Sequence, residues 1–245
     1  MKDVLFIGAM HGNEPIGVRV LKDLEDDGFD FDWMIGNPRA FQAGTRGTDA
    51  DLNRSAPGSP SSEVYEERRA AELIKLSRAY QFTIDIHGTE QRTGIFLIVT
   101  NPSRENLELA ARLDIDRIVI WPAFSPELNG PVSEFFRTGL EIECGPMGEG
   151  KTSGRLRVIL KSFLEEGIRQ NSIDLDVALS SREVYEVYGS LKSDVDVPLE
   201  EFVEVEIDGE VFTPLLVNSY RERNGITCYK MRKLDTRAGL TFISN

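Results

Sequence analysis

The chain has 245 residues, of which 40% are hydrophobic and 28% charged, and its formal net charge is -13. These values are typical of a globular protein that buries a large core. The acidic balance argues against nucleic acid or an anionic membrane as a partner, because both attract basic surfaces. We find no apolar run near the roughly 18 residues of a membrane span and no signal-peptide pattern, so we expect a cytoplasmic protein. The two cysteines, Cys144 and Cys228, do not form a disulfide framework.

Strand-like and helix-like segments alternate over the first 170 residues. Short apolar runs predict strands at 4–7, 32–35, 82–86, 94–99, 117–121 and 140–144, and amphipathic segments predict helices at 15–27, 62–80, 104–113 and 152–170. Two stretches rich in Gly, Pro and polar residues, 36–62 and 122–138, predict long loops of the kind that is usually functional. The alternation predicts an α/β domain over 1–175, with a mixed, largely parallel sheet flanked by helices.

The pattern changes after about residue 173. Two strand-like runs, 202–207 and 210–214, flank Asp208-Gly209, which is a strong signal for a two-residue hairpin turn. Further strands are predicted at 227–231 and 240–243. We therefore expect a small all-β domain over 180–245.

Both histidines of the chain follow strand-like runs. His11 lies in Gly8-Ala9-Met10-His11-Gly12-Asn13-Glu14-Pro15, and His87 ends the run Thr83-Ile84-Asp85-Ile86-His87. Two residues separate His11 from Glu14, so a turn can direct both side chains at one centre. Two imidazoles and a carboxylate suit a catalytic zinc ion, which takes three protein ligands and a water molecule. Ligands in such sheets collect at the carboxyl ends of strands, where His11, His87 and Glu143 are expected.

An ordered set of motifs between residues 8 and 146 resembles the aspartoacylase and succinylglutamate desuccinylase family, relatives of the zinc carboxypeptidases. Beyond His11-x-x-Glu14 and His87, the matching motifs are Asn37-Pro38-Arg39-Ala40, Arg46, Asp51-Leu52-Asn53-Arg54 and Ile142-Glu143-Cys144-Gly145-Pro146. The resemblance implies a zinc-carboxypeptidase-like sheet and a C-terminal β domain that caps the cleft.

The resemblance also implies a role for each residue at the metal. His11, Glu14 and His87 would hold one Zn²⁺ ion per chain, which activates water. Asp85 would orient His87 from behind. Glu143 would act as the general base and then as the acid.

Four further residues are implied to contact the substrate. Arg46 would stabilise the oxyanion, and Asn53 and Arg54 would hold the α-carboxylate of the amino-acid half. Tyr220 would enter the site from the β domain. Asp51, beside this group, is expected to fix its loop through turn hydrogen bonds.

The sequence departs from the family in one place. An aspartoacylase carries an arginine about ten residues before the motif glutamate, where this chain has Ser133. Either Arg137 substitutes for it or the side pocket differs. Glu141 also shares a strand face with Glu143, so the choice of Glu143 as the base rests on the family motif.

The most specific hypothesis is a zinc-dependent amidohydrolase that removes the acyl group from a small N-acyl amino acid. The same residues would serve a metallocarboxypeptidase acting on peptide C-termini, and a non-catalytic zinc-binding domain is the third alternative. A thermolysin-like protease is excluded, because the chain has no His-Glu-x-x-His helix. The sequence leaves the oligomeric state open, a homodimer included.

Overall fold

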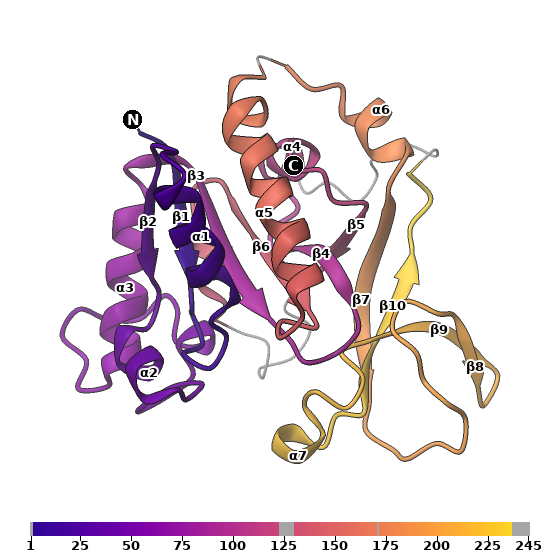
Figure 1. Cartoon of the computed structure of the whole chain (residues 1–245). Coiled ribbons are helices and arrows are strands. Elements are labelled where there is room, and N and C mark those ends of the chain that lie inside the picture. Colours follow the sequence, from indigo (N-terminus) through magenta and orange to yellow (C-terminus); the bar gives the residue numbers. More distant parts are fainter. Residues whose placement is uncertain (1, 123–129, 171, 237–245) are drawn as a thin grey trace.

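One sheet organises the part of the chain that the computed structural model describes, residues 2–122, 130–170 and 172–236 (Figure 1). Its ten strands run in the order β2-β1-β3-β6-β4-β5-β7-β10-β9-β8. The strands are β1 (Lys2–Gly8), β2 (Asp32–Ile35), β3 (Tyr80–Gly88), β4 (Gly94–Val99), β5 (Arg117–Ile120), β6 (Gly139–Gly145), β7 (Glu183–Leu191), β8 (Val205–Ile207), β9 (Glu210–Leu215) and β10 (Cys228–Lys233). The helices are α1 (Ile16–Asp26), α2 (Pro38–Ala43), α3 (Tyr65–Ser77), α4 (Arg104–Ala111), α5 (Gly150–Glu165), α6 (Leu175–Ser180) and α7 (Arg221–Asn224), with short 3-10 turns η1 (Leu52–Arg54), η3 (Val132–Phe135) and η4 (Gly167–Arg169).

The sheet is largely parallel in its first half and antiparallel at its C-terminal end. β1 pairs in parallel with β2 and β3, and β3 pairs in parallel with β6. β4 runs antiparallel to β6, while β7, β10, β9 and β8 form antiparallel neighbours. The predicted α/β architecture, with antiparallel strands at its C-terminal end, is confirmed.

The two faces of the sheet bury different side chains. Even positions of β1, such as Val4 and Phe6, belong to a core that also contains residues of α1 and α5, and Figure 1 shows these two helices on the same face. Odd positions, such as Leu5 and Ile7, belong to a second core with α3, η1 and η3. Because side chains alternate along a strand, the sheet presents one set of residues to each helical layer.

The predicted loop 36–62 contains two helical segments, so that part of the prediction is wrong. The side chain of Asn37 accepts a hydrogen bond from the amide of Ala40, and Pro38 occupies the first turn of α2. Both are features of helix N-termini. Gly44 then ends α2 with a φ of 65°, which glycine adopts without strain.

A single carboxylate of α3 fastens the rest of this loop. Glu66 accepts hydrogen bonds from the amide and hydroxyl of Thr48, at 2.8 and 2.7 Å, and from the amides of Asp49 and Ala50, at 3.2 and 3.1 Å. Glu66 is fully buried, so these donors replace the water that its charge would otherwise need. The loop therefore holds positions 46–51 in a fixed place beside α3.

The C-terminal region continues the same sheet. β7, which the sequence pattern did not reveal, pairs in parallel with β5 and antiparallel with β10. Asp208 and Gly209 have φ of 52° and 80° between β8 and β9, which confirms the predicted hairpin turn. The predicted strand at 240–243 lies outside the described residues. The division into domains 1–175 and 180–245 stays a prediction.

Candidate metal centre and active-site pocket

The turn after β1 positions His11 and Glu14. The backbone leaves the strand through Ala9, whose φ is 53°, and the amide of Glu14 donates to the carbonyl of His11 at 3.1 Å. A Cβ on Gly12 would lie 2.0 Å from the carbonyl carbon of Ala40 in α2, so only glycine fits between the turn and that helix. The turn is consequently packed backbone against backbone.

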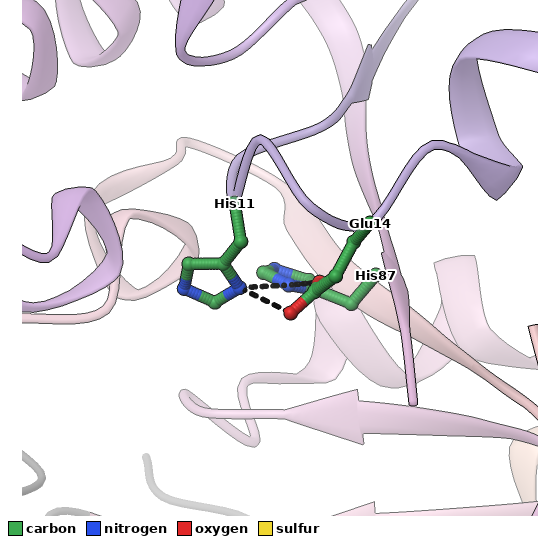
Figure 2. Close-up of side chains that lie close together, drawn as sticks. All are labelled: His11, Glu14 and His87. Carbon is green, nitrogen blue, oxygen red and sulfur yellow. Dashed lines mark hydrogen bonds and ion pairs between the residues drawn. The ribbon is translucent and has the colours of Figure 1, made fainter. Parts of the chain in front are cut away.

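Three buried side chains converge at the ends of β1 and β3. Figure 2 shows His11, Glu14 and His87 pointing toward one another from the turn and from the end of β3. Glu14 Oε1 lies 2.8 Å from Nδ1 of His11, and its Oε2 lies 3.1 Å from Nδ1 of His87. The two Nδ1 atoms are 3.3 Å apart. The sequence-predicted ligand set is therefore brought together.

The donor atoms fit a zinc ion. Each of these three residues offers one ligand atom within 4.8 Å of the others. Ligands at ~2.0–2.2 Å from a tetrahedral ion lie roughly 3.3 Å from one another, close to the three separations given above. Two imidazole nitrogens that face one carboxylate and each other also suit a shared cation between them. The arrangement is that of a three-ligand site with room for one further ligand.

A second carboxylate holds each histidine from behind. Asp85 Oδ2 lies 2.9 Å from Nε2 of His87, as the sequence predicted, and Asp51 Oδ1 lies 3.1 Å from Nε2 of His11. The role of Asp51 was missed, although its predicted turn hydrogen bond to the amide of Asn53 is present at 3.0 Å. Such contacts fix the tautomer, so that Nδ1 of each ring faces the metal position.

These carboxylates also change the proton affinity of the centre. Burial by itself would lower the pKa of His87, but Asp85 and Glu141 outweigh burial and raise that pKa well above its usual value. Burial raises the pKa of Asp85 in spite of its hydrogen-bonded histidine. Burial would likewise raise the pKa of Glu14, yet the two histidines hold it well below its usual value. Without a metal ion, Glu14 is therefore ionised and His87 holds a proton, which a metal ion would have to displace.

Arg46 links the metal position to the loop. Its Nε donates to Asp51 Oδ2 at 2.8 Å, and its Nη1 donates to Glu14 Oε1 at 3.3 Å. The guanidinium also lies over the ring of Tyr220, at 5.9 Å from the centroid. Arg46 is thus a cation held at the edge of the metal position by residues from both ends of the chain.

Glu143 lies beside His87, because these residues are paired in the register of β3 and β6. It is 8% exposed and lines the same pocket as the metal residues. Burial, and after it the nearby Glu14, raise the pKa of Glu143 to about 8. A carboxyl group with this pKa can both accept and return a proton near neutral pH.

The neighbouring carboxylate, Glu141, has a different environment. Its Oε1 accepts hydrogen bonds from Asn53 Nδ2 at 3.2 Å and from Ser133 Oγ at 2.7 Å. Asn53 Oδ1 in turn accepts from the amide of Val132 at 2.9 Å. Asn53 lines the pocket as predicted, but its side chain is also bound to the protein at both ends. The structure therefore separates Glu141 and Glu143, which the sequence pattern did not.

The remaining predicted residues also line this pocket of about 340 Å³, a size in the usual range for small-molecule sites. Arg54 lines the pocket, and its Nη1 donates to the carbonyl of Asn53 at 2.6 Å. Tyr220, just before α7, lines it together with Leu216 and Ser219. Trp121, which packs against an apolar core as a partly buried side chain, lines the pocket too. No local pattern could have revealed that placement, since it depends on the long-range order of the strands.

Position 133, where the family carries an arginine, is buried in this chain. Ser133 is buried and bonded to Glu141, whereas Arg137 is exposed and is not among the described residues that line the pocket. Of the two readings that the sequence left open, the geometry favours a different side pocket over substitution by Arg137.

Comparisons with known proteins agree with this fold. The crystal structure of murine aminoacylase 3 matches with a TM-score of 0.69 and 22% identity, over 95% of each chain. The succinylglutamate desuccinylase from Chromobacterium violaceum matches with a TM-score of 0.69 and 18% identity, over 95% of this chain and 85% of that one. The class of protein is therefore the α/β fold that these two enzymes share.

Sequence comparison then gives the family. Residues 1–154 match the model of the succinylglutamate desuccinylase/aspartoacylase catalytic domain, and the chain belongs to that family. A probable aspartoacylase from Acaryochloris marina is 30% identical over 185 residues, which cover 68% of this chain and 60% of the relative. The chain spans less than two thirds of the first aspartoacylase relatives it matches. No helix of the described residues is long and apolar enough to cross a membrane.

Proposed function

We propose that the protein is a zinc-dependent amidohydrolase that cleaves the amide bond of a small N-acyl amino acid. The observation that carries the proposal is the convergence of His11, Glu14 and His87 beside Glu143 in one pocket. Family membership supports the reaction class. The mouse N-acyl-aromatic-L-amino acid amidohydrolase (carboxylate-forming), a further relative, is 28% identical over 217 residues, or 77% of this chain and 68% of that protein.

The metal residues have a direct role in this proposal. His11, Glu14 and His87 would hold one zinc ion, oriented by Asp51 and Asp85. A bound zinc ion supplies Lewis acidity, which lowers the pKa of water and polarises a carbonyl group. The buried carboxylates behind the imidazoles keep the Nδ1 atoms aimed at the ion.

The proton transfers are assigned to Glu143. Its buried carboxyl group lies beside His87 in the pocket, where it would take a proton from the attacking water and return it to the leaving nitrogen. Arg46 lies against Glu14 at the edge of the metal position, where its charge would stabilise the oxyanion that forms from the carbonyl. Asn53 and Arg54, which both line the pocket, would hold the α-carboxylate. Tyr220 would enter the site from the C-terminal region.

The test is amide hydrolysis by the zinc-loaded protein and by its chelated form. The substrates are a set of N-acetyl amino acids and a blocked dipeptide with a free C-terminus. We expect metal-dependent release from the N-acetyl amino acids. Cleavage of the dipeptide alone would instead identify a metallocarboxypeptidase.

A variant pair separates catalysis from metal binding. Glu143→Gln should retain one zinc ion per chain and lose at least about a hundredfold in kcat, the usual contribution of a positioned general base. Glu206→Gln, at an exposed position of β8, is the matched control and should keep full activity. Zinc binding without turnover in the unsubstituted protein would contradict the proposal and support a non-catalytic domain.

A further inference from the structure

Glu141 occupies the floor of the pocket beyond the metal position. It is 5% exposed and lines the pocket together with Glu143, two residues further along β6. Residues two apart on a strand share a face, and the register pairs Glu141 with Ile98 of the neighbouring strand β4. Ile98 and Trp121 line the same pocket. Along the floor of the pocket, the metal position is therefore followed by Glu143, then by Glu141, and then by the apolar side chains of Ile98 and Trp121.

One oxygen of Glu141 lacks a donor. Asn53 and Ser133 both donate to Oε1. Oε2 forms a long ion pair with Nε2 of His87, at 3.9 Å, but no hydrogen bond, and that nitrogen is already bonded to Asp85. In the described part of the chain no hydrogen bond reaches Oε2. Glu141 lines the pocket, so a carboxylate oxygen there without a hydrogen-bond donor suits a ligand that brings one.

The charges next to Glu141 disfavour a second acidic group there, while Arg223 lines the pocket on the side of Tyr220. The family resemblance places an arginine at the position of Ser133, and in this chain Ser133 donates to Glu141. Arg46 is already paired with Asp51 and Glu14. An acidic side chain would therefore face Glu141 at short range, and like charges in a desolvated site repel strongly.

We propose that Glu141 is the specificity-determining residue of the pocket and selects N-acyl amino acids whose side chain ends in a cationic amine. The methylene part of such a side chain would lie against Ile98 and the ring of Trp121, and its ammonium group would donate to Oε2 of Glu141. The inference rests on the proposed hydrolase function, since it names the side chain of that enzyme's substrate. Glu141 acts on binding, while the proton transfers remain with Glu143.

The test compares three ligands that differ at the end of the side chain. Nα-acetylornithine and Nα-acetylnorleucine have the same number of side-chain atoms and end in an ammonium or a methyl group, and N-acetylglutamate ends in a carboxylate. Their Kd values are measured by calorimetry on the zinc-loaded Glu143→Gln protein, in which turnover is suppressed. We expect acetylornithine to bind roughly tenfold or more tightly than acetylnorleucine, the scale of one charge-assisted hydrogen bond. N-acetylglutamate should bind most weakly.

A second change, Glu141→Gln, tests the residue itself. Glutamine still accepts from Asn53 and Ser133 but carries no charge, so the preference for acetylornithine over acetylnorleucine should fall to about twofold or less. Glu206→Gln in the same background should leave the preference unchanged. Zinc content and Tm show whether each variant is folded. If Glu141→Gln does not fold, the three-ligand comparison still tests the inference.

Three results would overturn the inference. They are binding of acetylnorleucine or N-acetylglutamate at least as tight as that of acetylornithine, an unchanged preference in Glu141→Gln, and no binding of any of the three ligands. Failure of the proposed function is distinguishable from these. It would appear as tight binding of acetylornithine to the unsubstituted, zinc-loaded protein without hydrolysis.

Discussion

The two walls of the pocket are held in different ways. In the metal wall, formed by His11, Glu14 and His87 with Asp51 and Asp85 behind them, each side chain has at least one charged or hydrogen-bonded partner, although Oδ1 of the buried Asp85 has none among the described residues. The apolar wall, formed by Ile98, Trp121, Leu216, Ser219 and Tyr220, contains two buried donors, Trp121 Nε1 and Ser219 Oγ, with no partner among the described residues. The metal wall is therefore held by polar contacts within the protein, while the apolar wall is held mainly by packing.

Removal of a metal ligand should have the largest effect on the metal wall. His87→Ala should not retain zinc at a stoichiometric protein concentration. This effect is larger than the roughly 10–100-fold loss of zinc affinity expected when an outer carboxylate is replaced. Metal content after dialysis measures it. Tyr220→Phe, in the apolar wall, is the control and should retain one ion per chain. Full zinc retention in His87→Ala would show that the ion binds elsewhere.

The next change removes the charge behind a ligand without removing the ligand. Asp85→Asn should weaken zinc binding by roughly 10–100-fold, because the imidazole of His87 loses its orienting carboxylate. A competition titration with a chromophoric chelator gives the affinity. Asp176→Asn, at an exposed position of α6, should be neutral. An unchanged affinity in Asp85→Asn would mean that packing alone orients the ring.

The raised pKa of His87 predicts that zinc affinity depends on pH. The metal-free protein holds a proton on His87 at neutral pH, because Asp85 and Glu141 outweigh burial, and zinc must displace that proton. The apparent affinity should therefore fall by up to about tenfold per pH unit for each displaced proton as the pH is lowered. The same chelator titration at pH 6, 7 and 8 measures the slope. A flat profile would mean that His87 is already neutral before the metal binds.

The smallest effect is expected in the apolar wall. Trp121→Phe removes a buried donor that has no partner in the described structure, so no protein hydrogen bond is lost. The free energy of unfolding should change by less than about 1 kcal/mol. Urea denaturation of the metal-free protein measures it. A loss of more than about 2 kcal/mol would show that the indole N–H is bonded within the protein.

The sequence predicted the features that depend on neighbouring residues. The strands that carry His87 and Glu143 were visible as apolar runs, and the metal ligands stood in short motifs. β7 was missed because Glu183–Leu191 interrupts its apolar residues with Glu186 and Gly189. α2 was missed because Asn and Pro, which usually mark turns, here begin a helix.

Pairings between distant residues could not be predicted in the same way. The contact of Asp51 with His11 joins residues 40 positions apart, and that of Asn53 with Glu141 joins residues 88 positions apart. Neither leaves a local pattern, since each depends on the order of strands in the sheet. The environments of Glu141 and Glu143 could be separated only once η1 and η3 were seen above β6.

The alternation of β6 has a consequence for folding. Leu140 and Ile142 face the core with α1 and α5, while Glu141 and Glu143 face the pocket. A slip of one residue in the pairing of β6 with β3 would exchange these two sets. It would place two carboxylates in the largest apolar core and two aliphatic side chains beside the metal ligands. Glu141 and Glu143 therefore also raise the free energy of a misaligned sheet. The register that gives the stable fold is the same register that completes the site.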